Sequence, residues 1–263
     1  MRAWVGGVAV LGPGLPDWAA SEAVLAGEQP WQMTEAAAPA PAILPSTERR
    51  RTSATVRFAL AVATEATAEE PDRAALETIF ASANGDGATV TGILNAMHEP
   101  EGAISPTQFH NSVHNAAAGY WHIAVGSTAP SVSMGGHDGA FAAGLLSAMA
   151  GVAARGRPVL LCAYDMPMPP PLASVQPTAF PFAVAMVLHP APGERTRAML
   201  ELRYVAGGCP GEPPCGEGLD ALAAGNPAAR SLPLLRALAA RKAALARLAL
   251  TADSHLEVRV APC

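Results

Sequence analysis

The sequence contains little charge and almost no lysine. Charged residues make up 15% of its 263 positions, Lys242 is the only lysine, and the formal net charge is −5. Because no basic stretch is interleaved with aromatic residues, the composition argues against nucleic-acid binding. Hydrophobic residues make up 50% of the chain, which excludes a disordered, solvated chain. A chain of this length can build one large domain or two small ones.

Hydrophobic runs long enough to cross a bilayer are also lacking. The most apolar uncharged run, residues 139–154, is shorter than the roughly 20 residues that a membrane helix needs. A second uncharged stretch, residues 166–193, is interrupted by eight prolines. Because Arg2 is followed by a strand-like Gly/Val/Leu pattern and not by a signal peptide, we expect a cytoplasmic protein.

Cysteine occurs only four times, at 162, 209, 215 and 263. In the expected reducing compartment these residues are thiols. Cys209 and Cys215 bracket Pro-Gly-Glu-Pro-Pro, a turn-rich loop, whereas zinc ligands are usually separated by about two to four residues. We therefore expect two ordinary thiols in this loop, and neither a metal nor a cofactor.

Hydrophobic periodicity predicts strands that alternate with helices. Strands are expected over 4–11, 78–83, 131–134 and 158–163, and helices over 18–25, after the N-cap Ser53, over 90–97, after Ser105 and over 139–154. Residues 119–126 fit the end of a helix or a short strand. Two strands, 182–188 and 199–205, flank a Pro-Gly turn, and an amphipathic helix (232–250) and a last edge strand (255–260) follow. This alternation is typical of an α/β fold with a mixed sheet.

Three segments in this order carry a family resemblance: Ser105-Pro106-Thr107-Gln108-Phe109, then residues 112–120, then Ala129-Pro130-Ser131-Val132-Ser133. They resemble the N-terminal half of the β-ketoacyl synthases, which have the thiolase fold. The resemblance covers roughly the first 190 residues and is greatest to the short chain-length-factor proteins of aryl polyene clusters. It implies a ketosynthase-like domain over residues 1–206, completed by residues 207–263, with the second catalytic half of the fold absent.

The resemblance also identifies the position of the missing nucleophile. In active ketosynthases a cysteine lies at a strand-to-helix elbow, where the helix N-terminus favours the thiolate. Counting forward without gaps from Ala129-Pro130-Ser131 places that position at Asp138. Aspartate can cap a helix but cannot form the acyl thioester on which condensation depends. The histidines, or histidine and lysine, that complete the site belong to the absent half, so we expect no catalysis by this chain alone.

The resemblance implies a non-catalytic partner that forms a heterodimer with a full-length ketosynthase and meets acyl carrier protein through that complex. The low charge content fits a chain that buries surface against another. The candidates for the interface or an acyl tunnel are Phe109, His114, Asn115, Tyr120, Trp121, Met134 and His137. Among them Phe109, Tyr120, Trp121 and Met134 are bulky enough to limit acyl length.

Three alternatives remain open. His137 and Asp138 resemble the base and orienting acid of an acyltransferase or thioesterase, with Ser131 or Ser133 as nucleophile, although no Gly-x-Ser-x-Gly elbow occurs. His110 and His114 have the i, i+4 spacing of two zinc ligands but lack the glutamate of a metallopeptidase motif. The chain could also be a structural homodimer. The stretch Met166-Pro167-Met168-Pro169 either lines an acyl tunnel or forms a rigid connection.

Overall fold

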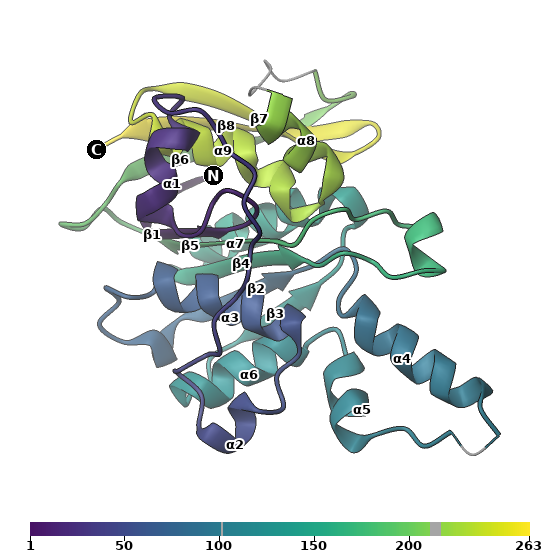
Figure 1. Cartoon of the computed structure of the whole chain (residues 1–263). Helices are drawn as coiled ribbons and strands as arrows, with labels where there is room; N and C mark the ends of the chain where they lie inside the picture. The colour runs from purple at the N-terminus through teal and green to yellow at the C-terminus, as the bar shows by residue number, and fades with distance from the viewer. Residues whose placement is uncertain (101, 211–216) are drawn as a thin grey trace.

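A mixed sheet runs through the middle of the protein (Figure 1). The structure is a computed structural model that describes residues 1–100, 102–210 and 217–263. In these residues the sheet has eight strands, in the order β3-β2-β4-β5-β1-β6-β8-β7. The strands are β1 (Arg2–Leu11), β2 (Glu77–Ala81), β3 (Ser131–Met134), β4 (Val159–Asp165), β5 (Phe182–His189), β6 (Ala198–Ala206), β7 (Ala244–Thr251) and β8 (Ser254–Pro262). Strands β3, β2 and β4 are parallel, and every other neighbouring pair is antiparallel.

Helices cover both faces of the sheet. The α-helices are α1 (Trp18–Leu25), α2 (Ser46–Arg49), α3 (Ala54–Ala66), α4 (Gly87–His98), α5 (Pro106–Ser112), α6 (Ala116–Val125), α7 (Ala140–Arg155), α8 (Glu217–Gly225) and α9 (Leu232–Ala239). Single turns of 3₁₀ helix lie at η1 (Arg73–Ala75), η2 (His137–Gly139), η3 (Leu172–Ser174) and η4 (Ala228–Ser231). Side chains of α3 and α6 form a core on one face, and side chains of α1, α7, α8 and α9 form the core on the other.

Local sequence explains where several of these elements begin. The side chains of Asp17, Ser53 and Asp86 accept hydrogen bonds from backbone N–H groups in the first turns of α1, α3 and α4. Ser105 and Gln108 form a capping box at the start of α5. All seven residues of β4 are buried, as expected for a strand covered on both faces. The predicted mixed α/β sheet is confirmed.

Two predictions about the second half of the chain are wrong. Residues 232–250 do not form one helix: α9 ends at Ala239, Arg241 turns the chain with φ +49°, and β7 follows. Ala246 and Leu248 are buried with a period of two, and pairing with β8 decides their conformation over the helix propensity of alanine and leucine. Strand β8 is not an edge strand, because β7 lies outside it.

The two strands predicted around the Pro-Gly turn are present as β5 and β6. They do not pair with each other, because β1 lies between them and pairs with both. The place of β1 between β5 and β6 depends on contacts that are distant in sequence. For residues 119–126 the sequence pattern fits either the end of a helix or a short strand. In the structure these residues form most of α6.

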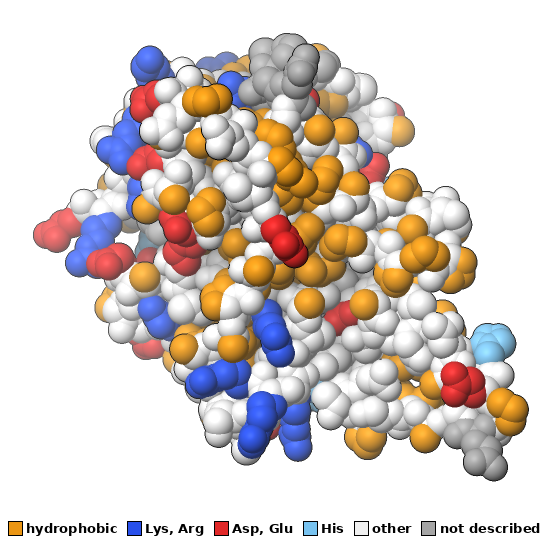
Figure 2. Space-filling model, viewed as in Figure 1, with side chains coloured by type: hydrophobic (Ala, Val, Ile, Leu, Met, Phe, Trp, Pro, Cys, Tyr) orange, Lys and Arg blue, Asp and Glu red, His pale blue; other side chains and the backbone are white. Residues whose placement is uncertain are grey.

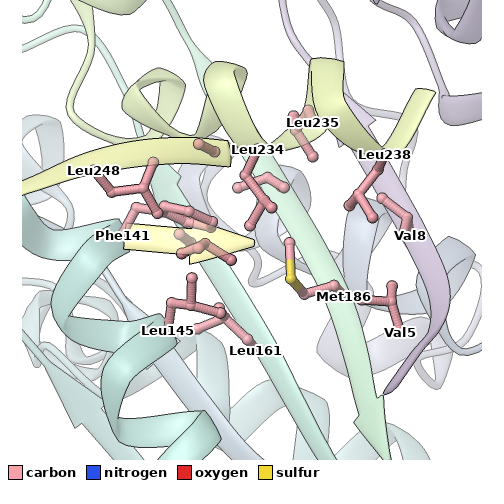
Figure 3. Packing of buried hydrophobic residues seen from close by; sticks show 14 of the residues in the cluster. Val5, Val8, Phe141, Leu145, Leu161, Met186, Leu234, Leu235, Leu238 and Leu248 are labelled. Atoms are coloured by element: carbon pink, nitrogen blue, oxygen red, sulfur yellow. The ribbon is translucent and has the colours of Figure 1, made fainter. Parts of the chain in front are cut away.

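The last elements of the chain close one core around α7. Leu234 and Leu235 from α9, Leu248 from β7 and Leu256 from β8 are buried in the same cluster as Phe141 of α7. Figure 3 shows Leu248 and Leu234 packed with Phe141 and Met186. Burial on both sides explains why α7 is apolar over most of its circumference.

Helices α4 and α5 stand out from the body of the protein (Figure 1). Gly87 is the one residue of α4 that is buried. Leu94, Met97 and Phe109 on these helices have 42, 65 and 66% of their surface exposed. None of the described helices combines the length and the apolar character that a membrane span requires.

Candidate functional site

The predicted nucleophile position lies at a sharp connection between a parallel strand and a central helix. β3 ends at Met134, Gly135 and Gly136 turn the chain, and the 3₁₀ turn η2 leads directly into α7. His137 has φ +49°, a left-handed conformation that is uncommon for a residue with a β carbon. The elbow that the resemblance implied is therefore present, with Asp138 in its second helical position.

Asp138 contacts two segments that are distant from it in sequence. One carboxylate oxygen, Oδ2, accepts a hydrogen bond from the Arg230 guanidinium at 2.8 Å, and the side chains are 44 and 38% exposed. The other oxygen, Oδ1, accepts from Nε2 of Gln176 at 3.4 Å. Nδ1 of His137 lies 3.6 Å from Oδ1. Asp138 thus joins the elbow to the β4–β5 connection and to η4.

A buried carboxyl group lies at the end of β4, near the elbow. Oδ1 of Asp165 accepts hydrogen bonds from the Ser82 hydroxyl at 2.8 Å and from the backbone N–H of Asn84 at 3.0 Å. Asp165 is 1% exposed, and its Oδ2 has no partner among the described residues. Burial raises the pKa of Asp165 to about 7; the hydrogen bonds oppose this rise, and the nearby Asp138 adds to it.

The predicted interface and tunnel residues do not form one cluster. Tyr120 and Trp121 are 1 and 0% exposed and pack in the core formed with α3, whereas Phe109 and His137 lie on the surface. The side chain of Met134 packs at the border of the opposite core. The remaining two candidates lie in the connection between α5 and α6. Asn115 is the N-cap residue of α6, and His114 lies against Gly85.

Apolar side chains are exposed along one edge of the sheet. β3 is an edge strand, and its Val132 is 46% exposed. The Thr78 hydroxyl lies 3.1 Å from Nε2 of His122 on α6 and 2.7 Å from the hydroxyl of Ser131 on β3, which places α6 beside β3. We use the name β3 edge for Val132 together with Ile123, which is 51% exposed on α6. Figure 2 shows further hydrophobic side chains on the protruding α4–α5 region.

The metal and hydrolase alternatives gain no geometric support. α5 ends at Ser112 and Val113 is extended, so His110 and His114 do not lie on one helix face. Among the described residues, no group of three His, Cys, Asp or Glu side chains is placed to hold a metal ion. The Ser131 hydroxyl is hydrogen-bonded to Thr78 at the end of β3 away from the elbow. Cys215 and most of its loop lie outside the described residues, and the prediction for that loop stays a prediction.

Sequence reasoning missed Arg230, Gln176 and Asp165. Arg230 and Gln176 follow the elbow by 92 and 38 positions, and no local pattern links them to it. Asp165 had a weak signal, since it is the single carboxylate at the end of a continuous apolar strand.

A mixed sheet covered on both faces, with an elbow between a parallel strand and a central buried helix, defines a thiolase-like α/β protein. The model of the β-ketoacyl synthase N-terminal domain matches residues 21–211, and the chain belongs to this family. The fold class predicted from the sequence is thereby confirmed. No curated protein sequence matches the chain.

Three solved structures illustrate the likeness. One is the ketosynthase ApeO in complex with its chain length factor ApeC from Xenorhabdus doucetiae, with a TM-score of 0.72 and 21% identity over 99% of both chains. The AntDE:AntF complex, a type II PKS acyl-carrier protein with its ketosynthase, gives a TM-score of 0.75 and 11% identity over 100% of this chain and 99% of the matched one. A bacillaene synthase module 6 ketosynthase from Bacillus subtilis 168 gives 0.56 and 11% over 79% of this chain and 41% of its own. At these identities the likenesses show the fold alone.

Proposed function

We propose that this protein is a non-catalytic partner subunit of the chain-length-factor type, which forms a heterodimer with a full-length ketosynthase. The complex would elongate acyl chains in aryl polyene, polyketide or fatty-acid-type synthesis, and acyl carrier protein would meet this chain through the complex. The observation that carries the proposal is the aspartate at the elbow. By the count from Ala129-Pro130-Ser131, Asp138 stands at the expected nucleophile position, where an aspartate could not form a thioester. Its carboxylate is engaged by Arg230.

The β3 edge supports a role in pairing with another chain. An exposed edge strand presents unpaired backbone N–H and C=O groups, which a second protein can use. Here the edge strand carries Val132, and Ile123 of the adjacent α6 is 51% exposed. Phe109 and Val113, on and after α5, are also exposed, at 66 and 47%. A ketosynthase is the partner that the elbow favours, because this chain supplies the fold of a condensing subunit without its nucleophile. Two of the similar structures are themselves complexes of ketosynthases.

We further propose that residues 207–263 complete the same domain as residues 1–206. Leu234, Leu248 and Leu256 belong to the core that also contains Val5 and Phe141. On this proposal, the candidates for limiting acyl length are the exposed Phe109 and the partly buried Met134. Tyr120 and Trp121 would act on acyl length only through the core that they fill.

The test is co-expression of this 26.8 kDa chain with each ketosynthase encoded in the same genome, followed by light scattering of the purified material. The proposal predicts a one-to-one complex with one of them, and condensation of carrier-bound acyl units by the complex but not by this chain alone. A chain that is stable alone and binds none of these ketosynthases would overturn the proposal. A homodimer that persists in the presence of every ketosynthase would favour the structural alternative.

A further inference from the structure

The connection between β4 and β5 is much longer than its geometry requires. The two strands are antiparallel neighbours, and such strands can be joined by about two residues. The chain instead uses residues 166–181, which we call the Pro-rich loop because six of its positions are proline. Its tip carries Val175, which is 81% exposed and is the most exposed large hydrophobic side chain described. Figure 1 shows the loop, with η3, extending away from the sheet.

Three side chains from different parts of the chain fasten the second half of this loop. Gln176 donates to Asp138 of the elbow at 3.4 Å, and Nδ2 of the Asn84 side chain donates to the Thr178 hydroxyl at 2.7 Å. Asn226 donates to the carbonyl oxygen of Phe180 at 2.5 Å. The first half of the loop rests on the start of α4, where Met168 lies directly over Gly87. An exposed apolar tip is therefore held by a built set of polar contacts at its base.

Asp138 holds Gln176, the residue next to Val175 at the tip. Of Asp138, Asn84 and Asn226, Asp138 is the one that also forms an ion pair. Its Oδ2 holds Arg230 of η4 while its Oδ1 holds Gln176, so one carboxylate fixes the loop and the C-terminal segment to the elbow. Cysteine could not replace it in this role, because a neutral thiol cannot satisfy the guanidinium. The Nε of Arg230 is already buried without a partner among the described residues. Loss of the Asp138 carboxylate would also remove the hydrogen-bond acceptor of the Arg230 Nη2 group.

We propose that Asp138 is a positioning residue: together with Arg230 it latches the Pro-rich loop against the elbow and so fixes the place of Val175. The position that supplies the nucleophile in a condensing enzyme serves here as a structural anchor. The latch itself is a property of this chain alone. Its use, to present Val175 as an apolar contact to the ketosynthase, rests on the proposed function. A rigid, preorganised apolar tip loses little conformational entropy on binding, which favours the complex.

Amide hydrogen exchange of the isolated chain tests the latch. The backbone amide of Ala179 donates to Gly225 outside the loop, so its exchange reports detachment of the loop, whereas the amide of Gln176 donates to Leu172 within the loop. Asp138→Ala and Arg230→Ala should each raise exchange at Ala179 by roughly tenfold or more, because local opening needs only the local contacts to break. The milder Asp138→Asn keeps an acceptor for Gln176 and should give a smaller rise. Amides of β4 serve as the internal control and should stay protected in all variants.

The charge exchange Asp138→Arg with Arg230→Asp separates a specific pair from a general packing effect. The double variant should return exchange at Ala179 to within about threefold of the wild type, because an ion pair can form again. Unchanged exchange in the single alanine variants, or no recovery in the double variant, would overturn the latch. If the alanine variants do not fold, Asp138→Asn and the rise of wild-type exchange with salt decide the question, since the half-exposed pair is screened.

Binding to the ketosynthase is measured in parallel. If loop exchange rises and Asp138→Ala weakens the complex, the latch and its use both stand. If loop exchange rises but no ketosynthase binds even the wild type, the latch stands and the proposed function falls. If the complex is as tight with Asp138→Ala as with the wild type although the loop opens, the presentation of Val175 is wrong.

Discussion

The backbone of Gly139, the last residue of η2, lies directly against the carbonyl oxygen of Leu250 in β7. The elbow and the C-terminal hairpin are thus in contact at a point where no β carbon fits. Gly136, three residues earlier, is similarly close to the backbone of Ala140. The turn into α7 depends on these close approaches, and the position of Asp138 between them depends on the turn.

Gly139→Ala should therefore destabilise the protein, because backbone must move to admit the methyl group. We expect a loss of about 1–3 kcal/mol in the free energy of unfolding, the usual range for overpacking. Gly119→Ala is the matched control: it lies within α6, and a β carbon there meets nothing within 4 Å. That change should stabilise the protein by about 0.5–1 kcal/mol. Denaturant unfolding of both variants provides the measurement, and equal effects at the two glycines would contradict the argument.

Much of the fold could be predicted where local pattern and tertiary environment agree. α1 has the predicted bounds, and β4 was expected from its apolar run. Residues 232–250 show the opposite case. Their Ala/Leu/Arg pattern fits a helical period, and nothing local reports that β8 offers Ala246 and Leu248 a partner strand. The turn at Arg241 arises from the same tertiary pairing.

The candidate site was predictable only through the resemblance. Asp138 was located by counting from Ala129-Pro130-Ser131, and the structure places an elbow at that point. Its partners Arg230 and Gln176 come from segments that the fold alone brings to it. The bulky residues Tyr120 and Trp121 illustrate a further limit, since their size does not reveal whether they line a pocket or fill a core.

Trp121→Ala should act on stability before it acts on acyl length. Trp121 is fully buried, and removal of a buried Trp side chain costs about 3–5 kcal/mol. Phe109→Ala, at a residue that is 66% exposed, should change stability by less than about 0.5 kcal/mol. Under the proposed function Phe109→Ala should shift product length or weaken the complex. The measurement is thermal unfolding together with product analysis of the reconstituted complex, and a stable Trp121→Ala variant would contradict the first expectation.

Under the proposed function, Val132→Lys should weaken association with the ketosynthase while leaving the isolated chain folded. The substitution places a charge on the edge strand β3, and lysine is a residue that blocks edge-to-edge pairing. We expect the dissociation constant of the complex to rise at least about tenfold, the effect of losing a central apolar contact. Leu245→Lys is the control, since β7 forms the other edge of the sheet and Leu245 is 38% exposed. Equal weakening by both variants, measured by light scattering, would argue against the β3 edge as the interface.

Asp165→Asn should remove part of the pH dependence of stability. The pKa of Asp165 is about 7 in the folded protein, against 3.8 as its ordinary value, so between about pH 4 and pH 7 the folded state retains a proton that the unfolded state has lost. The stabilisation from this group is therefore complete below about pH 4 and is lost as the pH rises to about 7, at up to about 1.4 kcal/mol per pH unit. Asparagine keeps an oxygen acceptor for Ser82 and Asn84 and does not titrate.

The measurement is the free energy of unfolding of wild type and Asp165→Asn from pH 4 to pH 8. Relative to the wild type, the variant should gain stability from pH 4 to about pH 7, by at most about 4 kcal/mol, and the difference should stay constant above that. Burial also raises the pKa of Glu65 to about 7, so the variant retains a weaker slope in the same window, which Glu65→Gln should reduce further. A constant offset between wild type and Asp165→Asn across this range would mean that Asp165 is ionised in the folded protein throughout, since an unsatisfied amide hydrogen shifts the whole curve but not its slope.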